Sequence, residues 1–484
     1  MGIISAIKGW WNRMFKSEAE NLFGTTITSS TMEAAISDWL SIYQGKPDWV
    51  DPEDDIKTIN FASTVCEETA RLTTLDIGVQ FDGRRAEYMQ NWSDRAVMPK
   101  LREWLEYGMA LGTVIMKPNG TGVDMVTPGN FEITDKDGMH NISGITFQDR
   151  YQSGDNWYTK LEHHKFQKMK VRYPDSEEYQ EVTFYNIQNR VFISSNEGEL
   201  GKPCTLGETK WSNLQEEVNI TKKNGDCLNG MLFGVFRVPS ANKIDVNSPL
   251  GMSIFSSAIE EMKDLDVCYS RKAFEIYHSK KIVFMDDRLT MLPATMNEKG
   301  ERVQRSIKLP SYVKNVSGSD AENYYQEVNP QLNVDERIKD INNQLSFVGY
   351  KCGYSEGYFV FDSKTGMVTA TQVESDDRRT IQLIKDIRDA LQVCLNDLYY
   401  AQSVFADLYN LAPAGDYEPS YSFGDITYNY EEDKQMWWKY VTAGKVPAWK
   451  YFVKFEKMSE DEAKAMQAEL EEKEKAQQGL FEEE

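Results

Sequence analysis

Histidine and cysteine are scarce in this 484-residue chain, and no apolar run is long enough to cross a membrane. The 6 cysteines are scattered, so the spacing excludes a disulfide framework or a structural zinc site and predicts reduced thiols in a cytosolic protein. A spanning helix would need about 18 consecutive apolar residues, and none is present. We therefore expect no metal, no cofactor and no membrane span.

Residues suited to catalysis are equally sparse. Among the 4 histidines only His163 and His164 adjoin, and neighbouring strand residues point to opposite faces, so we expect an exposed pair rather than a metal or triad site. The Gly120-Thr121-Gly122 turn lacks the lysine and hydroxyl of a phosphate-binding loop. Asp286 and Asp287 have no partner carboxylates at a recognisable spacing. The chain is expected not to be an enzyme, and a metal-dependent nuclease is kept only as a third hypothesis.

Basic residues are outnumbered, since 54 Lys and Arg face 76 Asp and Glu, for a net charge of −22. This is the wrong sign for a protein that grips DNA, because such binding is driven by Lys and Arg releasing phosphate counterions. Ordinary solubility is one explanation of the acidity. The 40% of apolar residues still allows a large core in two or more modules.

Two segments have the apolar spacing of amphipathic helices, Leu250–Ser279 and Asn333–Tyr350. In the second, Asn333 can cap the start with Glu336 reaching back. The first carries its apolar residues at steps of three or four, which predicts one buried face: Phe255, Ile259, Met262, Leu265, Tyr269, Ala273 and Ile276.

A third, longer helix follows, with a capping box at Thr371 and Glu374 and a stop at Pro413 and Gly415. About forty helical residues would span roughly 60 Å. Between residues 113 and 238 the apolar period changes to two, with turn signals at Asn119-Gly120 and Asp137-Gly138, which predicts an antiparallel sheet. The segment between the first two helices also alternates from Lys281.

These features resemble the portal (connector) proteins of tailed double-stranded DNA bacteriophages. The segment Ser248–Phe255 with the helix and strand after it resembles the start of the portal stem. The segment Gly357–Asp362 continuing to Thr369–Glu374 resembles the portal channel loop and the start of its long helix. The similarity is closest over residues 245–410, and the order of elements agrees over nearly the whole chain.

The resemblance implies an α+β portal fold in which an antiparallel sheet-containing wing, two stem helices, an inserted clip lobe, a long wing helix and a helical crown follow one another. Its expected parts are an N-terminal amphipathic arm at 1–24, the wing at 25–249, stem helix 1 at 250–280, the clip at 281–332, stem helix 2 at 333–352, a tunnel loop at 353–370, the long helix and wing return at 371–430, and the crown with an acidic C-terminal helix at 431–484.

Portal function is then the expectation: a dodecameric ring at one capsid vertex of the virion, assembled in the host cytoplasm, through which DNA is packaged and ejected. The implied partners are double-stranded DNA passing without sequence specificity, a terminase packaging motor, major capsid and scaffolding proteins, and head–tail connector proteins. An acidic channel would repel the duplex everywhere, which favours sliding. The candidate site residues are, in the tunnel loop, Phe359, Asp362, Lys364, Met367 and Val368, and in the stem, Arg271, Lys272, Lys280, Lys281, Arg337 and Lys339.

An alternative reading starts from the N-terminus, where apolar residues between Ile3 and Phe15 lie beside Lys8, Arg13 and Lys16. Such a segment could bind a membrane surface, and the chain would then be a membrane-associated scaffold or a pore-forming protein. A docking helix or an arm is the more frequent use of this pattern. From Ser459 the composition predicts a charged, solvated helical tail.

Overall fold

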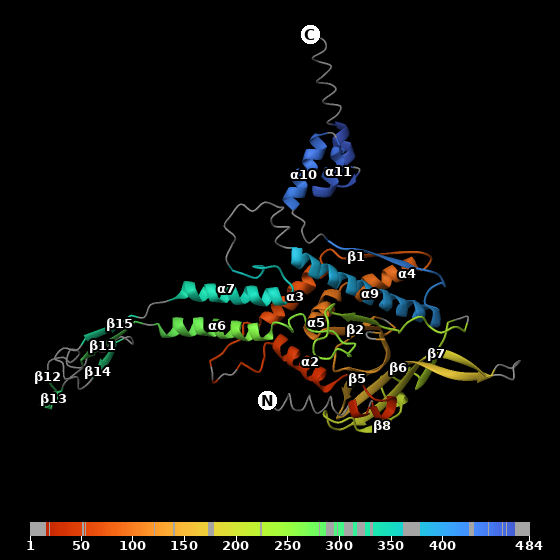
Figure 1. Ribbon diagram of the computed structural model, residues 1–484, viewed down its shortest axis with the longest axis horizontal. Helices are drawn as coiled ribbons and strands as arrows, with labels where there is room; N and C mark the ends of the chain where they lie inside the picture. The colour runs from red at the N-terminus through yellow and green to blue at the C-terminus, as the bar shows by residue number, and fades with distance from the viewer. Residues whose placement is uncertain are drawn as a thin grey trace, which may run out of the picture. The chain divides into compact units, whose positions relative to one another are not determined.

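The computed structural model describes residues 16–469 with the exception of 19, 51–52, 54, 121, 139–140, 173–178, 223–224, 280, 287–294, 298, 304–312, 317–324, 330–332, 362–377, 425–429, 444, 457 and 461. The chain divides into two compact units, Met1–Ser422 and Phe423–Glu484. The first is mixed α+β, as the sequence predicts (Figure 1).

The largest sheet of the first unit is antiparallel, with the strand order β4-β5-β6-β7-β8 and β9 paired to β7. Its β5–β6 hairpin turns at Gly154, where a φ of 60° suits a residue without a Cβ. Both turns expected from the sequence are confirmed, since Gly120 and Gly138 each have positive φ between paired strands. The strands are β4 (Phe131–Asp137), β5 (Asn141–Ser153), β6 (Asn156–Arg172), β7 (Tyr179–Ser194), β8 (Lys202–Cys204) and β9 (Glu217–Ile220).

Helices and two smaller sheets complete the body of this unit. A three-stranded sheet has the order β10-β2-β3, and β1 pairs with β16. The remaining elements of the body are α2 (Ser30–Tyr43), α3 (Phe61–Thr73), β1 (Gly78–Asp82), α4 (Ala86–Trp92), α5 (Leu101–Leu111), β2 (Thr113–Pro118), β3 (Val123–Val126), β10 (Gly234–Arg237), α9 (Arg378–Leu408) and β16 (Glu418–Ser422).

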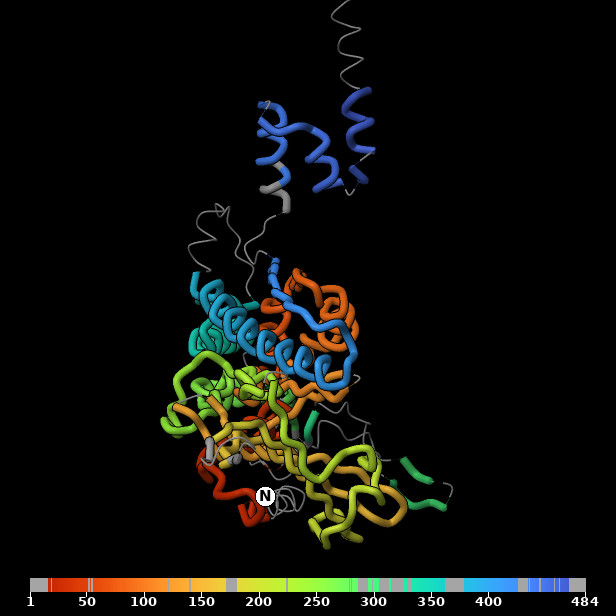
Figure 2. Tube along the Cα trace, turned by 90° about the vertical axis from the view of Figure 1, so that its right-hand side faces the viewer, coloured from red at the N-terminus to blue at the C-terminus, as the bar shows by residue number. Residues whose placement is uncertain are grey.

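Helix α9 is the main strut of the body. It runs beside α3 and contacts β10 and β2 (Figures 1 and 2). At β10 its backbone comes so close that a Cβ on Gly234 would lie 2.2 Å from the Cys394 carbonyl oxygen, so only glycine fits. The Arg388 guanidinium donates to the carbonyls of Leu72 and Thr73 at the end of α3. The expected capping box at Thr371 and Glu374 lies outside the described residues.

A buried charged cluster joins the sheet that contains β6 to the sheet that contains β2. The Glu162 carboxylate accepts from Lys117 Nζ at 2.7 Å and from Lys160 Nζ at 2.6 Å, and it is hydrogen-bonded to His164 Nε2 at 2.8 Å. Burial alone would raise the pKa of Glu162, but the two lysine charges and the hydrogen bond hold it well below its usual value. Because each buried charge has a partner, the cluster is a satisfied ion-pair network that ties β2 to β6.

The expectation of an exposed histidine pair is wrong, because His163 and His164 are 4% and 1% exposed. They do point to opposite faces. His164 Nδ1 is hydrogen-bonded to Tyr185 Oη at 2.7 Å, while the His163 ring stacks on Phe23 at 4.6 Å. Burial lowers the pKa of both rings, that of His163 to about 4, so both are neutral near pH 7.

The segment 16–29, which carries Phe23, covers the face of the sheet that His163 points to. It also buries Glu132, which lies two strands from His163 in the same cross-strand row. The Ile27 amide donates to the Ile133 carbonyl at 2.8 Å, which fixes the segment to the edge of β4. Among the described residues, Glu132 Oε2 has no hydrogen-bond partner. Burial raises the pKa of Glu132 to about 8. The negative charges of Glu33 and Glu20 act in the same direction, and the positive charge of Lys16 acts against them.

Replacing Glu132 with glutamine is expected to stabilise the protein at alkaline pH. The unfolded chain ionises this carboxyl above about pH 4.3, whereas the folded one keeps its proton up to about pH 8, so stability of the natural chain falls as pH rises through that window. The variant should gain about 2 to 4 kcal/mol at pH 8 and little at pH 5. Thermal melts at both values measure this, with the exposed Glu103→Gln as control. An equal gain at both values would contradict it.

The second unit, Phe423–Glu484, contains α10 (Tyr430–Thr442) and α11 (Ala448–Phe455). Aromatic side chains join these helices, with Trp438 and Tyr451 ring centroids 5.1 Å apart. The helix predicted from Ser459 begins with a capping box, since Glu462 N donates to Ser459 Oγ at 3.3 Å and Ser459 N donates to Glu462 Oε2 at 3.2 Å. The elements of this unit that the structure describes are therefore helices.

Candidate functional site: a helix pair with exposed apolar side chains

Two helices of the first unit, α6 (Ile259–His278) and α7 (Val334–Lys351), lie side by side and antiparallel (Figure 1). The sequence predicts both, but the helix expected from Leu250 begins nine residues later. Its first residues are held by the body of the unit instead, because Gly251 N donates to Thr113 Oγ1 at 2.8 Å and Ile254 N donates to the Met109 carbonyl at 3.0 Å. In a helix that began at Leu250 the Ile254 amide would donate to the Leu250 carbonyl, and its bond to Met109 prevents this.

The start of α7 also differs from the prediction. Asn333 precedes the helix as expected, but its side chain makes no capping hydrogen bond. The Asn333 backbone N–H instead donates to Glu275 Oε1 at 3.4 Å, across to α6. A contact between the two helices has thus replaced the local capping box with Glu336.

Polar contacts recur along the seam between α6 and α7 at a spacing of seven residues. On α6 the contributing residues are Glu261, Cys268 and Glu275. Glu261 forms an ion pair with Lys351, Cys268 Sγ donates to Asp340 Oδ2 at 3.1 Å, and Glu275 pairs with Arg337 at 2.8 Å. Seven residues are close to two helical turns, so the three contacts line one side of α6 and fix its register on α7.

The first half of α6 is covered by the segment 49–59 of the body. Asp266 accepts from the Ile59 amide at 2.8 Å and from Trp49 Nε1 at 3.0 Å, and the Lys57 amide donates to Ser270 Oγ at 2.8 Å. The apolar neighbours Met262 and Leu265 are buried there. The predicted buried face is thus correct for this half of the helix.

In the second half of α6 the predicted burial is wrong. Tyr269 is 38% exposed and Ile276 49% exposed, and Ala273 between them is also exposed. The helix extends beyond the part that segment 49–59 covers, while its apolar pattern continues. Four further large side chains of the pair are exposed as well: Phe274 and Tyr277 on α6, and Phe347 and Tyr350 on α7.

Between α6 and α7 the chain forms a small lobe. Its three-stranded sheet has β11 in the centre, parallel to β14 and antiparallel to β15, with Ile282 opposite Val328. All four residues of β15 are exposed at the sheet edge. The strands are β11 (Ile282–Asp286), β12 (Thr295–Met296), β13 (Arg302–Val303), β14 (Val313–Val316) and β15 (Tyr325–Val328).

The candidate stem cations have different environments. Arg337 pairs with Glu275 in the seam, and Lys281 pairs with Glu327 at 2.6 Å at the start of the lobe. These two therefore hold elements of this chain together. Arg271 and Lys339 are exposed, Lys272 is half-buried, and Lys280 lies outside the described residues.

Of the candidate tunnel-loop residues, only Phe359 lies within the described part of the chain. Its ring is half-buried and packs edge-on against Phe61 at 5.1 Å and Tyr354 at 4.7 Å. A Cβ on Gly349 of α7 would come within 3.1 Å of it. Phe359 therefore ties the chain after α7 to α3. Asp362, Lys364, Met367 and Val368 lie outside the described residues.

Two features of this region were missed from the sequence, and a signal exists for only one of them. The repeat of Glu261, Cys268 and Glu275 is visible as a spacing of seven within a predicted helix. The exposed apolar half of α6 has no local signal, because its cover comes from residues more than 200 positions earlier in the chain. What the arrangement offers is a surface of exposed apolar side chains on the helix pair.

The described residues lack two kinds of feature. They contain no group of three or more His, Cys, Asp or Glu side chains placed to hold a metal ion. No helix among them is long and apolar enough to span a bilayer. All six cysteines are free thiols, as predicted.

Comparison with known proteins adds a structural similarity. No protein-family model matches the chain, and no curated protein matches it. Among solved structures, it is similar to a chain described as part of the virion of a native gene transfer agent (GTA) particle. The TM-score is 0.35 at 9% sequence identity, over 88% of this chain and 99% of that chain, a level that does not establish a common fold.

Proposed function

We propose that the chain is a subunit of a portal ring at one vertex of a phage-type capsid, forming the channel through which double-stranded DNA is packaged and ejected. In this proposal α6 and α7 are the stem, the lobe 281–332 is the clip, and α9 belongs to the wing. The order of elements that resembles portal proteins supports it. The chain itself would carry out no catalysis, and a terminase motor would supply the energy.

The observation that supports this proposal best is the exposed apolar half of α6. Contiguous apolar side chains on a soluble protein mark a surface that another chain covers. The same surface repeated on identical subunits closes into a ring when the contact is head-to-tail and the rotation closes. The seam of Glu261, Cys268 and Glu275 fixes α6 on α7, so each copy would present this surface in the same register.

The charge of the chain fits a channel that does not retain DNA. With a net charge of −22 per subunit, a closed ring would repel phosphates over most of its surface. Arg337 and Lys281, two of the candidate stem cations, are already paired with carboxylates of the same chain. The duplex would therefore slide rather than bind.

Imaging of the purified chain by negative stain tests the proposal. A stalked ring with a central hole is expected, either from the isolated chain or from capsids made together with the major capsid and scaffolding proteins. Head–tail connector proteins should bind the same vertex. Capsids that contain the chain only as monomers would rule the proposal out.

Deleting residues 362–368 is expected to leave rings intact and to impair packaging or retention of DNA. In a ring this segment would recur at one level in every copy, and Phe359, the anchor before it, is retained. One lysine per copy gives few phosphate contacts, so Lys364→Ala should have a smaller effect than the deletion. The amount of DNase-protected genome in assembled capsids measures both. Normal yield and retention in the deletion would contradict a channel role for this segment.

A further inference from the structure

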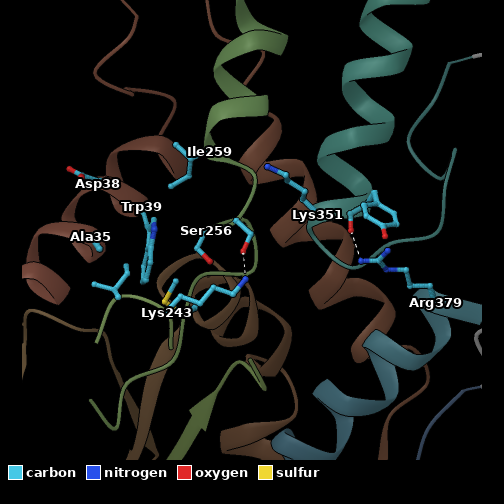
Figure 3. A pocket seen from close by; sticks show the side chains of 12 residues that line it. Ala35, Asp38, Trp39, Lys243, Ser256, Ile259, Lys351 and Arg379 are labelled. Atoms are coloured by element: carbon cyan, nitrogen blue, oxygen red, sulfur yellow. Dashed lines mark hydrogen bonds between the residues drawn. The ribbon is translucent and has the colours of Figure 1, made fainter. Parts of the chain in front are cut away.

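A groove of about 690 Å³ lies where the helix pair meets the body of the first unit (Figure 3). Its walls come from α2, from the segment 243–259 that leads into α6, from the end of α7 and from the start of α9. No part of the proposed portal function assigns a role to this groove.

Its rim is basic although the chain as a whole is acidic. Lys243, Lys351 and Arg379 line the groove, against one lining carboxylate, that of Asp38. Asp38 and Arg379 lie at opposite ends of it (Figure 3). Lys351 forms an ion pair with Glu261, so the local excess of positive charge comes from the other two cations.

Among the described residues, the contacts of those two cations are with neutral groups. Lys243 Nζ donates to Ser257 Oγ at 3.2 Å. Arg379 donates to the Tyr350 carbonyl at 2.8 Å, and its guanidinium carbon lies 3.8 Å from the Tyr350 ring centroid. Both side chains are exposed and keep further N–H donors, since an ammonium has three and a guanidinium five. They are therefore placed to donate hydrogen bonds to carboxylates from outside the chain.

The floor of the groove is apolar. Trp39 is 1% exposed and Met252 5% exposed at its base, with Ile259 half-buried and Ile244 exposed beside them. A concave apolar surface with a few polar groups at its rim is typical of a site that takes an apolar side chain and orients it by charge.

We infer that this groove binds an acidic peptide segment of a partner protein that carries a large apolar residue. The apolar side chain would lie on Trp39 and Met252, and flanking carboxylates would pair with Lys243 and Arg379. A peptide fits better than a DNA duplex, because a stiff duplex cannot place an apolar group on the recessed floor and the net charge of −22 repels it.

Fluorescence anisotropy tests this with a labelled synthetic peptide in which a Leu-Phe pair is flanked on both sides by glutamates. The full-length chain should bind it, and binding should weaken with added salt. The double variant Lys243→Glu, Arg379→Glu should weaken binding by about tenfold or more. The matched control, Lys202→Glu with Arg95→Glu, makes the same change of charge at exposed residues outside the groove and should bind normally.

Two altered peptides separate the two halves of the proposed site. Replacing the glutamates with glutamines, or the Leu-Phe pair with two serines, should each reduce binding. Ile244→Asp, at the exposed rim of the floor, should lose most affinity and keep the melting temperature of the natural chain. Equal loss in the control double variant, or undiminished binding of the serine peptide, would show nonspecific charge attraction and overturn the inference. Because the readout is peptide binding and not assembly, it is independent of the portal proposal.

Discussion

A chain carrying Tyr269→Asp and Ile276→Asp is expected to fold normally and to lose ring formation altogether. Both side chains are exposed in the single subunit, so aspartate costs little there. In a ring they would be covered, and a charge buried in an apolar contact without a partner is strongly unfavourable. Loss of one central apolar contact typically costs about 2 kcal/mol or more, and a closed ring repeats the loss at every interface.

Mass photometry, or counting of rings in capsids made with the variant, measures this effect. Met169→Asp is the matched control, since Met169 is 47% exposed on β6, away from the helix pair, and should leave rings unchanged. An unchanged melting temperature for the double variant confirms that the subunit is intact. If the double variant still forms rings of normal size, the α6 surface is not the interface between copies.

The sequence predicted the kinds of elements well where local pattern decides them. The antiparallel sheet, its turns at Gly120 and Gly138, and the two helices α6 and α7 all follow from apolar periodicity and turn residues. Their ends were less predictable. The start of α6 moved from Leu250 to Ile259 because the preceding amides bond to distant residues of α5 and β2.

Burial was the least predictable property, because it depends on what distant segments cover. His163 and His164 look exposed in the sequence, yet Phe23 from the N-terminal segment and Tyr185 from β7 enclose them. Tyr269 shows the opposite error, since its helix continues beyond the segment that buries Met262. In both cases the deciding partner lies far away in the chain, where no local pattern records it.

The lobe 281–332 is built so that it can be removed cleanly. Ile282 at its start lies directly opposite Val328 near its end, and antiparallel partners are only about 5 Å apart, so a short linker can join the two helices. On the helix pair next to the lobe, the ion pair of Glu275 and Arg337 holds α6 to α7 without help from the lobe. Strand β15 lies at the edge of this sheet with all four of its residues exposed, and an exposed sheet edge is a common place for a partner strand to add.

Replacing residues 281–332 with a short Gly/Ser linker is therefore expected to leave the body and the helix pair folded and to abolish binding of the packaging motor and of the head–tail connector proteins. Thermal melting should retain the main transition, because the body contacts that bury α6, at Asp266 and Ser270, are untouched. Pull-down of the terminase motor by the natural and the shortened chain measures the loss. A milder variant, Tyr325→Lys with Val328→Lys, alters only the exposed side chains of β15 and should weaken the same interaction while the lobe stays folded. Motor and connector proteins that still bind the shortened chain would place their docking surface elsewhere and refute the assignment of this lobe as the clip.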